Sequence, residues 1–358
     1  MSNFVLLEDK KPSVPQGAKM IVLGIGGGGV NAINSMISSQ EFPNVEFIAA
    51  NTDAQALAQS KASVAIQLGS KITKGLGAGS NPDTGRRAAE EDIEEVKKHI
   101  SHADILFVAA CLGGGSGSGG APVVAKAAKE LGILTVAVVT RPFKFEGRKR
   151  IKYAEEALAA LKSCVDTMIV VPNEKLLEIS DPKISIIDAF NLSNNILKQG
   201  VKGIYDIIQK TGLVNVDFAD IRTTMKEMGF AIMGTGKASG PERARKAAME
   251  AISSPLLDDI SIEGARGIII NITGNRDLGL HEINDAAQVL YSKVNEDANI
   301  IIGSVIDEGM ADELMVTVIA TGLNYEIKKE EKPVIPARND KSFQGEKTKE
   351  ESSPFKFF

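Results

Sequence analysis

The sequence has few of the residues that build disulfide or zinc scaffolds. Its 358 residues include two cysteines, three histidines and no tryptophan. A disulfide framework needs several cysteine pairs, whereas Cys111 and Cys164 stand alone in apolar stretches, so we expect a reducing, cytoplasmic setting. A structural zinc site needs clustered cysteine and histidine ligands, and the sequence contains no such cluster.

Long apolar runs and an excess of positive charge are also missing. No run approaches the ~18 residues that a membrane-spanning helix needs, and no apolar stretch follows Lys10 and Lys11, as a secretory signal would require. The formal net charge is −5, whereas nucleic-acid-binding proteins usually present a basic surface. We therefore expect no nucleic-acid partner, no signal peptide and no direct insertion into a membrane.

In the first half of the sequence, short apolar runs alternate with segments of helical pattern. One of these segments predicts a charged helix at 83–99. The apolar runs predict strands at residues 19–23, 45–50, 64–68, 104–110, 134–139 and 167–171. This order predicts an α/β fold with a mainly parallel, Rossmann-like sheet flanked by helices. Ligands bind at the carboxyl ends of strands in such sheets, so we expect loops that follow the strands to share one site.

A long helix divides the sequence. Apolar residues repeat at helical spacing between 184 and 210, and their wide stripe predicts burial between two layers. The stripe consists of Ile187, Phe190, Leu197, Val201, Ile204 and Ile208. We expect a flexible arm at 1–18, a first domain at 19–183, the central helix at 184–210, a smaller α/β domain at 211–323 and a disordered tail at 324–358.

The tail is rich in lysine and glutamate and ends in aromatic residues. Phe355, Phe357 and Phe358 lie at its tip. An aromatic tip on a disordered tail is typical of a docking peptide, because aromatic side chains serve as anchors. A terminus without function is the alternative, and composition does not decide between them.

Residues 111–122 are dominated by glycine and small polar residues, between the strand at 104–110 and a helix expected at 123–131. Glycines leave little side-chain bulk, so a ligand can approach the bare backbone. The N–H groups there and the dipole of the following helix favour an anion. The segment therefore predicts a loop that cradles phosphate.

A second glycine-rich loop follows the first strand, before a helix expected at 30–38. Gly24, Gly26 and Gly29 match the G-x-G-x-x-G fingerprint of dinucleotide-binding proteins, and Asp53 could serve as its ribose-binding acid. A dinucleotide-dependent oxidoreductase is therefore the first alternative. Four consecutive glycines and two phosphate loops instead favour one nucleoside polyphosphate held from two sides. Glycines that serve only tight turns are the structural alternative.

A P-loop NTPase is excluded, because no G-x-x-x-x-G-K-S/T motif is present and the nearest match, at 234–237, lacks the upstream glycine. Two acids are candidates to act on water. Asp217 and Asp220 follow the long helix, three residues apart, which places both carboxylates on one helical face. Alternatively Asp217 caps the helix that follows and Asp220 adds a favourable interaction with the helix dipole. The long helix spans about 40 Å, so the acids could reach a nucleotide only in a neighbour stacked head to tail.

Several blocks together resemble the FtsZ family of the tubulin superfamily over about residues 18 to 323. The blocks are 24–31, 51–53, 75–82, 113–119, 142–147, 215–220, 253–257 and 264–267. The resemblance implies a GTP-binding domain at 19–183 and a C-terminal GTPase-activating domain at 211–323. It also implies hydrolysis of GTP to GDP, head-to-tail filaments that form a ring at the mid-cell division site, and a cytoplasmic location. A non-hydrolysing scaffold of the same superfamily is the second alternative, against which Asp217 and Asp220 argue.

The resemblance also implies roles for individual residues. The expected nucleotide contacts come from Gly27, Gly28, Gly29, Val30, Asn31, Asn51, Gly114, Gly115, Ser116, Gly117 and Ser118. Glu146 would bind the ribose, Arg150 would face ribose and phosphates, Phe190 would stack near the base, and Asn194 would read the guanine edge. Asp217 and Asp220, with Asn215, would complete the site from the next subunit. Mg²⁺ would bind phosphates and waters, with no metal ligand assigned to the protein.

Three features depart from the family pattern. Ser116 stands where the family usually has threonine, which keeps the hydroxyl, and Asn194 stands where many members have aspartate. The tail ending at Phe355–Phe358 is only loosely similar to the terminal peptide through which the family binds division proteins and membrane tethers.

Overall fold

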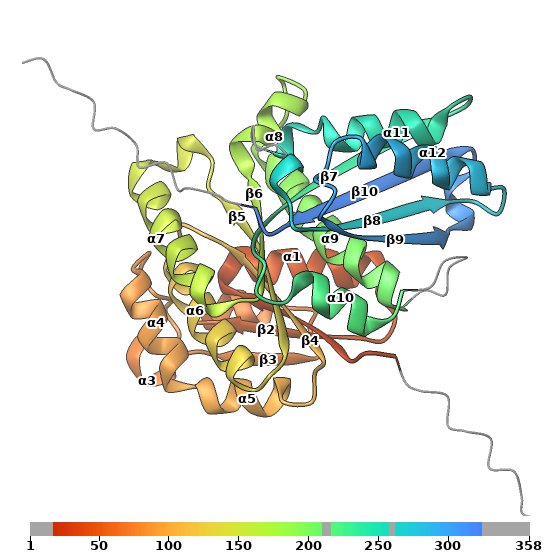
Figure 1. Cartoon of the computed structure of the whole chain (residues 1–358). Helices are drawn as coiled ribbons and strands as arrows, with labels where there is room; N and C mark the ends of the chain where they lie inside the picture. Colours follow the sequence, from red (N-terminus) through yellow and green to blue (C-terminus); the bar gives the residue numbers. More distant parts are fainter. Residues whose placement is uncertain (1–16, 210–215, 258–261, 324–358) are drawn as a thin grey trace, which may run out of the picture. The chain divides into compact units, whose positions relative to one another are not determined.

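The computed structural model describes residues 17–209, 216–257 and 262–323. These residues belong to one unit, Met1–Tyr325, and the second unit, Glu326–Phe358, lies outside them. Within the described part the strands form one ten-stranded sheet in the order β3-β2-β1-β4-β5-β6-β7-β10-β8-β9 (Figure 1). The predicted aromatic tip of the tail and the arm up to residue 16 therefore lie outside the described residues.

The first six strands are parallel neighbours. They are β1 (Met20–Ile25), β2 (Val45–Asn51), β3 (Val64–Gln67), β4 (Ile105–Cys111), β5 (Leu134–Arg141) and β6 (Thr167–Pro172). Almost every residue of β1, β4 and β5 is buried, because helices cover both faces of the sheet. The predicted mainly parallel α/β sheet is confirmed.

The sheet continues through the second half of the chain. Its strands there are β7 (Gly229–Ser239), β8 (Gly267–Gly274), β9 (Asn299–Ile306) and β10 (Glu313–Thr321). β7 joins β6 in parallel, β10 runs antiparallel to both β7 and β8, and β8 pairs with β9 in parallel. The predicted smaller α/β part thus shares one sheet with the first, and the domain boundaries themselves stay a prediction.

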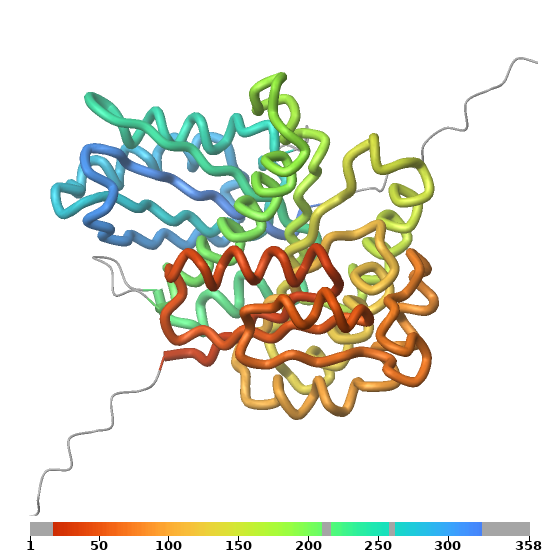
Figure 2. The backbone as a smooth tube through the Cα atoms, turned by 180° about the vertical axis from the view of Figure 1, so that it is seen from behind, coloured from red at the N-terminus to blue at the C-terminus, as the bar shows by residue number. Residues whose placement is uncertain are grey.

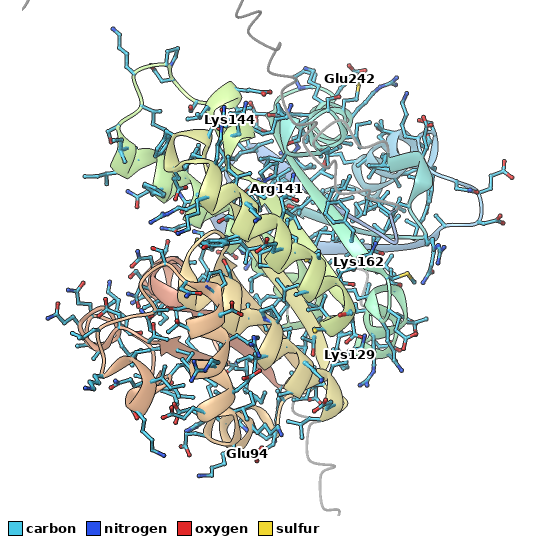
Figure 3. All side chains as sticks on the ribbon, turned by 90° about the vertical axis from the view of Figure 1, so that its left-hand side faces the viewer. Glu94, Lys129, Arg141, Lys144, Lys162 and Glu242 are labelled. Carbon is cyan, nitrogen blue, oxygen red and sulfur yellow. The ribbon has the colours of Figure 1, made fainter. Side chains whose placement is uncertain are left out.

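Two apolar cores lie on opposite faces of this sheet. One contains the buried sides of α4 (Pro82–Glu91), α5 (Ile93–Ile100), α6 (Gly115–Glu130), α7 (Arg148–Cys164), α11 (Arg243–Ile252) and α12 (Leu280–Tyr291). The other contains those of α1 (Gly26–Ser39), α9 (Ile186–Gln209) and α10 (Phe218–Met225). Figure 2 shows α1 alongside α9, and in Figure 3 α7 crosses the other face between Lys144 and Lys162. Because β1–β6 are parallel, their carboxyl ends lie at one edge of the sheet and their amino ends at the opposite edge.

The remaining elements are short. They are α2 (Ala54–Ala58), α3 (Ser70–Thr73), α8 (Asn173–Ile179) and the 3₁₀ turns Lys144–Glu146, Pro255–Leu257, Ile262–Gly264 and Glu308–Met310. None of the helices in the described segments is long and apolar enough to cross a membrane.

The predicted starts of two helices are wrong. α1 begins at Gly26 and α6 at Gly115, so most of the glycine-rich stretches, which we expected to be loops, form the first turns of helices. Glycine is a poor helix former, but these positions need it for packing. A Cβ atom on Gly119 would lie 2.0 Å from the carbonyl oxygen of Pro82, and one on Gly85 would lie 2.2 Å from that of Gly115. The backbones of α4 and α6 therefore pack directly against each other.

The predicted charged helix at 83–99 is two helices. The chain bends at Asp92, whose φ of −110° and ψ of 18° end α4 and begin α5. The Asp92 carboxylate accepts a hydrogen bond from the backbone N–H of Gly69 at 2.6 Å. This contact ties the bend to the segment after β3.

The central helix forms as predicted, but the first part of its apolar stripe is exposed. Leu197, Val201 and Ile204 are buried. Ile187 is 74% exposed and Phe190 is 40% exposed, so burial between layers is wrong for the first turns of α9. The helix runs from the carboxyl edge of the sheet to its amino edge. Near its start the Ser193 hydroxyl donates a hydrogen bond to the side-chain oxygen of Asn173, which follows β6. At its end the Gln209 amide donates to the carbonyl oxygen of Ala18, which precedes β1.

Candidate nucleotide-binding site

The glycine-rich starts of α1 and α6 lie side by side at the carboxyl ends of β1 and β4, which are neighbours in the sheet. A Cβ atom on Gly26 would lie 2.8 Å from the backbone nitrogen of Gly117. One on Gly28 would lie 2.5 Å from the Sγ of Cys111. Two helix N-termini, each with a positive dipole end, are thus brought together by close backbone contact.

The first N–H groups of both helices have no side-chain cap. Neither Ile25, which precedes α1, nor Gly114, which precedes α6, makes a side-chain capping hydrogen bond. Helix N-termini without caps need another acceptor, and an anion is the group that the two dipoles favour. The arrangement therefore matches the phosphate loop that the sequence predicts, although its N–H groups come from helix turns.

Two glycines in this region have no role in packing. A Cβ atom on Gly27 or Gly114 would meet no atom within 4 Å. Gly114 has an ordinary φ of −87°, so its backbone conformation does not require glycine either. Bare backbone facing open space is what close approach of a ligand requires. These two positions therefore argue against the alternative that the glycines serve only turns.

The two serines of the motif have different partners. The Ser118 hydroxyl is buried and accepts a hydrogen bond from the backbone N–H of Gly113 at 2.8 Å. Ser116 is half-buried, and its Oγ lies 2.6 Å from the Oγ1 of Thr52. Ser118 thus shapes the turn, whereas Ser116 keeps one side open to a ligand.

Asn51 and Asp53, at the end of β2, are engaged in local structure. Asn51 is 2% exposed, and its side-chain oxygen accepts from the backbone N–H of Asp53 at 3.3 Å. The Asp53 carboxylate accepts from the N–H groups of Gln55 and Ala56 and so caps α2. Asp53 is the acid that a dinucleotide fingerprint would use for ribose. Its use as a helix cap argues against the oxidoreductase alternative.

Glu146 and Arg150 lie on the other side of the phosphate region. Glu146 Oε2 lies 2.7 Å from Arg150 Nη1, and the other carboxylate oxygen accepts from the Phe143 N–H at 3.0 Å. The Glu146 side chain is 12% exposed and that of Arg150 is 47% exposed. A Cβ atom on Gly113 would lie 3.0 Å from the carbonyl oxygen of Arg150. This pair therefore adjoins the turn before α6.

An aromatic group marks the start of α9. The ring of Phe190 meets that of Phe143 edge-on, with centroids 5.5 Å apart, and that of Phe145 at 6.4 Å. Because Phe143 is fully buried and Phe190 is partly exposed, one face of the group is available to a planar ligand. Asn194 follows one helical turn after Phe190 and is half-buried. Phe143 links this group to Glu146, because its N–H donates to the Glu146 carboxylate.

The two acids lie at the opposite edge of the sheet. Asp217 Oδ1 accepts a hydrogen bond from the backbone N–H of Asp220 at 2.8 Å and so caps α10. The other end of α10 contacts the amino ends of strands: Thr167, the first residue of β6, donates to the Met225 carbonyl. Asp217 and Asp220 are both exposed. The capping interpretation of Asp217 is confirmed, and Asn215 lies outside the described residues.

No three histidine, cysteine or acidic side chains gather as candidate metal ligands within residues 17–209, 216–257 and 262–323. Hydroxyl and backbone groups dominate the phosphate region. This donor set suits an Mg²⁺ ion that is held chiefly by phosphate oxygens and water.

The comparisons with known proteins agree with this geometry. The sequence profile of the Tubulin/FtsZ family, GTPase domain, matches residues 19–181, and that of the FtsZ family, C-terminal domain, matches residues 229–324. The chain belongs to the FtsZ family. Its first part is therefore a GTPase domain that binds GTP and GDP, and the resemblance to FtsZ in the sequence analysis is confirmed.

Individual relatives cover most of the chain. The cell division protein FtsZ of Coxiella burnetii is 52% identical over 309 residues, which are 86% of this chain and 80% of that protein. The cell division protein FtsZ of Pseudomonas aeruginosa is 51% identical over 322 residues, 90% of this chain and 82% of that protein. A solved FtsZ dimer from M. jannaschii is 43% identical, with a TM-score of 0.82, over 86% of this chain and 89% of that chain.

One residue that contacts the phosphate region is absent from the set predicted from the sequence. Thr52 lies between Asn51 and Asp53, and its buried hydroxyl contacts Ser116. The sequence could have indicated Thr52 through its position directly after β2, next to Asn51, an expected nucleotide contact. The contact itself crosses from one strand end to another, so no local pattern indicates it.

Proposed function

We propose that this FtsZ family member is a cell-division protein that hydrolyses GTP only where two subunits meet head to tail. The observation that carries the proposal is the separation of the two halves of the site. The uncapped helix starts lie at the carboxyl edge of the sheet, whereas Asp217 and Asp220 lie at its amino edge, near the end of α9. α9 has 24 residues, which corresponds to about 36 Å. One chain therefore cannot bring its own acids to its own nucleotide.

The phosphates lie against the first turns of α1 and α6. Gly27 and Gly114 allow the closest approach, and the N–H groups at and after Gly28, Gly115 and Gly117 donate to phosphate oxygens. The remaining contacts of this group are Gly29, Val30, Asn31, Asn51, Ser116 and Ser118. Because the donors are fixed by buried helices, they need no rearrangement when charge develops during hydrolysis.

The nucleoside extends toward α7 and α9. Glu146 accepts hydrogen bonds from the ribose hydroxyls, and Arg150 supplies a cation to ribose and phosphates. The base packs on Phe190, and the Asn194 side-chain oxygen accepts from the guanine edge. Asparagine lacks the charge of aspartate but keeps this acceptor, so guanine recognition is retained.

The water that attacks the phosphate is held by the neighbouring subunit. The exposed carboxylates of Asp217 and Asp220, with Asn215, orient and polarise it. Mg²⁺, which would be held through phosphates and waters and to which no protein ligand is assigned, would supply neutralisation of the phosphate charge. The half-buried hydroxyl of Ser116 lies in the phosphate region and contacts a phosphate oxygen.

Head-to-tail contact does not close on itself, so it generates filaments. We place these filaments in the cytoplasm, in the ring at the mid-cell division site. The tail ending at Phe355–Phe358 contacts division proteins and membrane tethers. No nucleic acid takes part.

A mixing experiment tests the shared site. Gly114→Asp puts a carboxylate at the phosphate position without a steric clash, because space is open there, and Gly114→Asn is its neutral control. Gly115 is a poor choice, since a Cβ atom there would lie 2.8 Å from that of Ala78. Gly114→Asp and Asp220→Ala should each be inactive alone and should regain phosphate release when mixed. A mixture no more active than the sum of its parts would contradict the proposal.

A further inference from the structure

Thr52 connects a third strand end to the phosphate region. It follows β2, and its side chain is fully buried. Its Oγ1 lies 2.6 Å from the Oγ of Ser116, and either hydroxyl could donate in this pair. Ser116 lies in the first turn of α6. The direction of this hydrogen bond decides what Ser116 can offer to a ligand.

A hydroxyl has one proton to donate. If Ser116 donated to Thr52, it would present only lone pairs to an anionic phosphate oxygen, which is repulsive. If Thr52 donates to Ser116, the Ser116 proton is free to point at the phosphate, and the first hydrogen bond polarises the second. We propose that Thr52 is a positioning residue that donates to Ser116 and thereby makes Ser116 a phosphate donor. This inference rests on the proposed function of the site.

Thr52 is held firmly enough for this role. Its carbonyl oxygen accepts from the Thr73 hydroxyl at 3.2 Å and from the Gly77 N–H at 3.2 Å. A β-branched side chain on a fixed backbone has few rotamers. The hydroxyl of Thr52 is therefore fixed relative to Ser116, which as serine would otherwise rotate freely.

GDP affinity is the measurement, because GDP binding requires neither hydrolysis nor assembly. Thr52→Val keeps the shape of the side chain and removes the hydroxyl, and it should weaken GDP binding about tenfold. Thr52→Ser keeps the hydroxyl but lacks the methyl that limits its rotamers, so it should restore part of the affinity and bind GDP more tightly than Thr52→Val. Failure of Thr52→Ser to restore binding, or full affinity in Thr52→Val, would overturn the inference.

A double-mutant cycle separates positioning from a general structural effect. In a Ser116→Ala background, Thr52→Val should cause no further loss of GDP affinity, because the hydroxyl that it positions is gone. Thr135→Val is the matched structural control, since Thr135 is also a fully buried threonine, but it lies at the amino end of β5 and its hydroxyl donates to the Ile133 carbonyl. Its effect on affinity should add to that of Ser116→Ala. Additive losses for Thr52→Val would overturn the positioning role.

The cycle also distinguishes this inference from the proposed function. If Ser116→Ala binds GDP as well as the unmodified protein, the phosphate role of Ser116 itself is wrong. If Ser116→Ala weakens binding and Thr52→Val does not, only the role of Thr52 is wrong.

Discussion

The carboxylate of Asp217 accepts a hydrogen bond from the backbone N–H of Asp220 at 2.8 Å. One acid of the pair thus uses an oxygen to cap α10 and still presents the rest of its carboxylate to solvent. The capping and catalytic interpretations are therefore compatible, and they can be separated by substitution.

Asp217→Asn should keep the cap, because an amide oxygen is as good an N-cap acceptor as a carboxylate. Asp217→Ala should lose about 1 kcal/mol of the free energy of unfolding. If the carboxylate acts on water, both variants should lose most of the GTPase activity at equal protein concentration. Thermal unfolding and phosphate release measure the two effects. An active Asp217→Asn would limit Asp217 to its structural role.

Gly27 and Gly28 are a matched pair of adjacent positions. Gly28→Ala should destabilise the fold by about 1–3 kcal/mol, because its Cβ atom would lie 2.5 Å from the Cβ and Sγ of Cys111. Gly27→Ala meets no atom and should leave the melting temperature unchanged, but the added methyl should weaken nucleotide binding. Equal GDP affinity in Gly27→Ala and the unmodified protein would show that the ligand does not approach this turn.

Glu146→Gln tests the ribose contact. Glutamine keeps an oxygen that can accept from the Phe143 N–H, so the turn before α7 should stay folded. It removes the charge that faces Arg150 and weakens the acceptor for ribose hydroxyls, so GDP affinity should fall by about tenfold. 2′-Deoxy-GDP is the control ligand. Its affinity should change much less than that of GDP, and an equal change for both ligands would contradict a ribose contact.

The ion pair between Arg243 and Glu282 predicts a pH dependence of stability. Arg243 Nε lies 2.7 Å from the Glu282 carboxylate, which also accepts from the Gly279 N–H at the start of α12. The hydrogen bond from Arg243 lowers the pKa of Glu282 below its ordinary value. A lowered folded-state pKa contributes stability above the unfolded-state pKa, and this contribution is lost as the pH falls through the folded-state value.

Glu282→Gln should therefore unfold more easily than the unmodified protein at pH 7, with a difference that shrinks as the pH falls below about 4.3, the ordinary glutamate value. Urea denaturation at several pH values measures this. Arg276 and Glu308 form an exposed pair, and Glu308→Gln is the control, which should show little effect at any pH. A constant difference between Glu282→Gln and the unmodified protein would exclude the ion pair as its cause.

The sequence predicts most of the strands, because both faces of the sheet are covered and each buried strand leaves a continuous apolar run. β4 is an example, since all but its last residue are buried. The starts of α1 and α6 could not be predicted in this way. Glycine disfavours helices locally, and only the close packing of Gly119 against Pro82 in the folded chain shows why glycine stands in the first turns of α6.

The site was predicted unevenly for the same reason. The glycines and the acids stand in recognisable blocks. The contacts between side chains are not apparent in these blocks. Two such contacts are the hydrogen bond between Thr52 and Ser116 and the ion pair between Glu146 and Arg150. Glu146 and Arg150 are four residues apart, but Glu146 ends a 3₁₀ turn and Arg150 lies in α7, with Gly147 at a φ of 101° between the two elements, so helical spacing does not give their contact. Thr52 and Ser116 are far apart in the sequence and meet only because β2 and β4 flank β1 in the sheet.

The location of phosphate turns and acids at opposite edges of one sheet makes the two ends of a filament chemically different. At one end the last subunit presents a bound nucleotide with no acids above it, and at the other end it presents acids with no nucleotide below. A filament would therefore contain one hydrolytic site fewer than it has subunits. At the end that presents the uncovered nucleotide, each newly added subunit would keep its GTP until the next subunit adds.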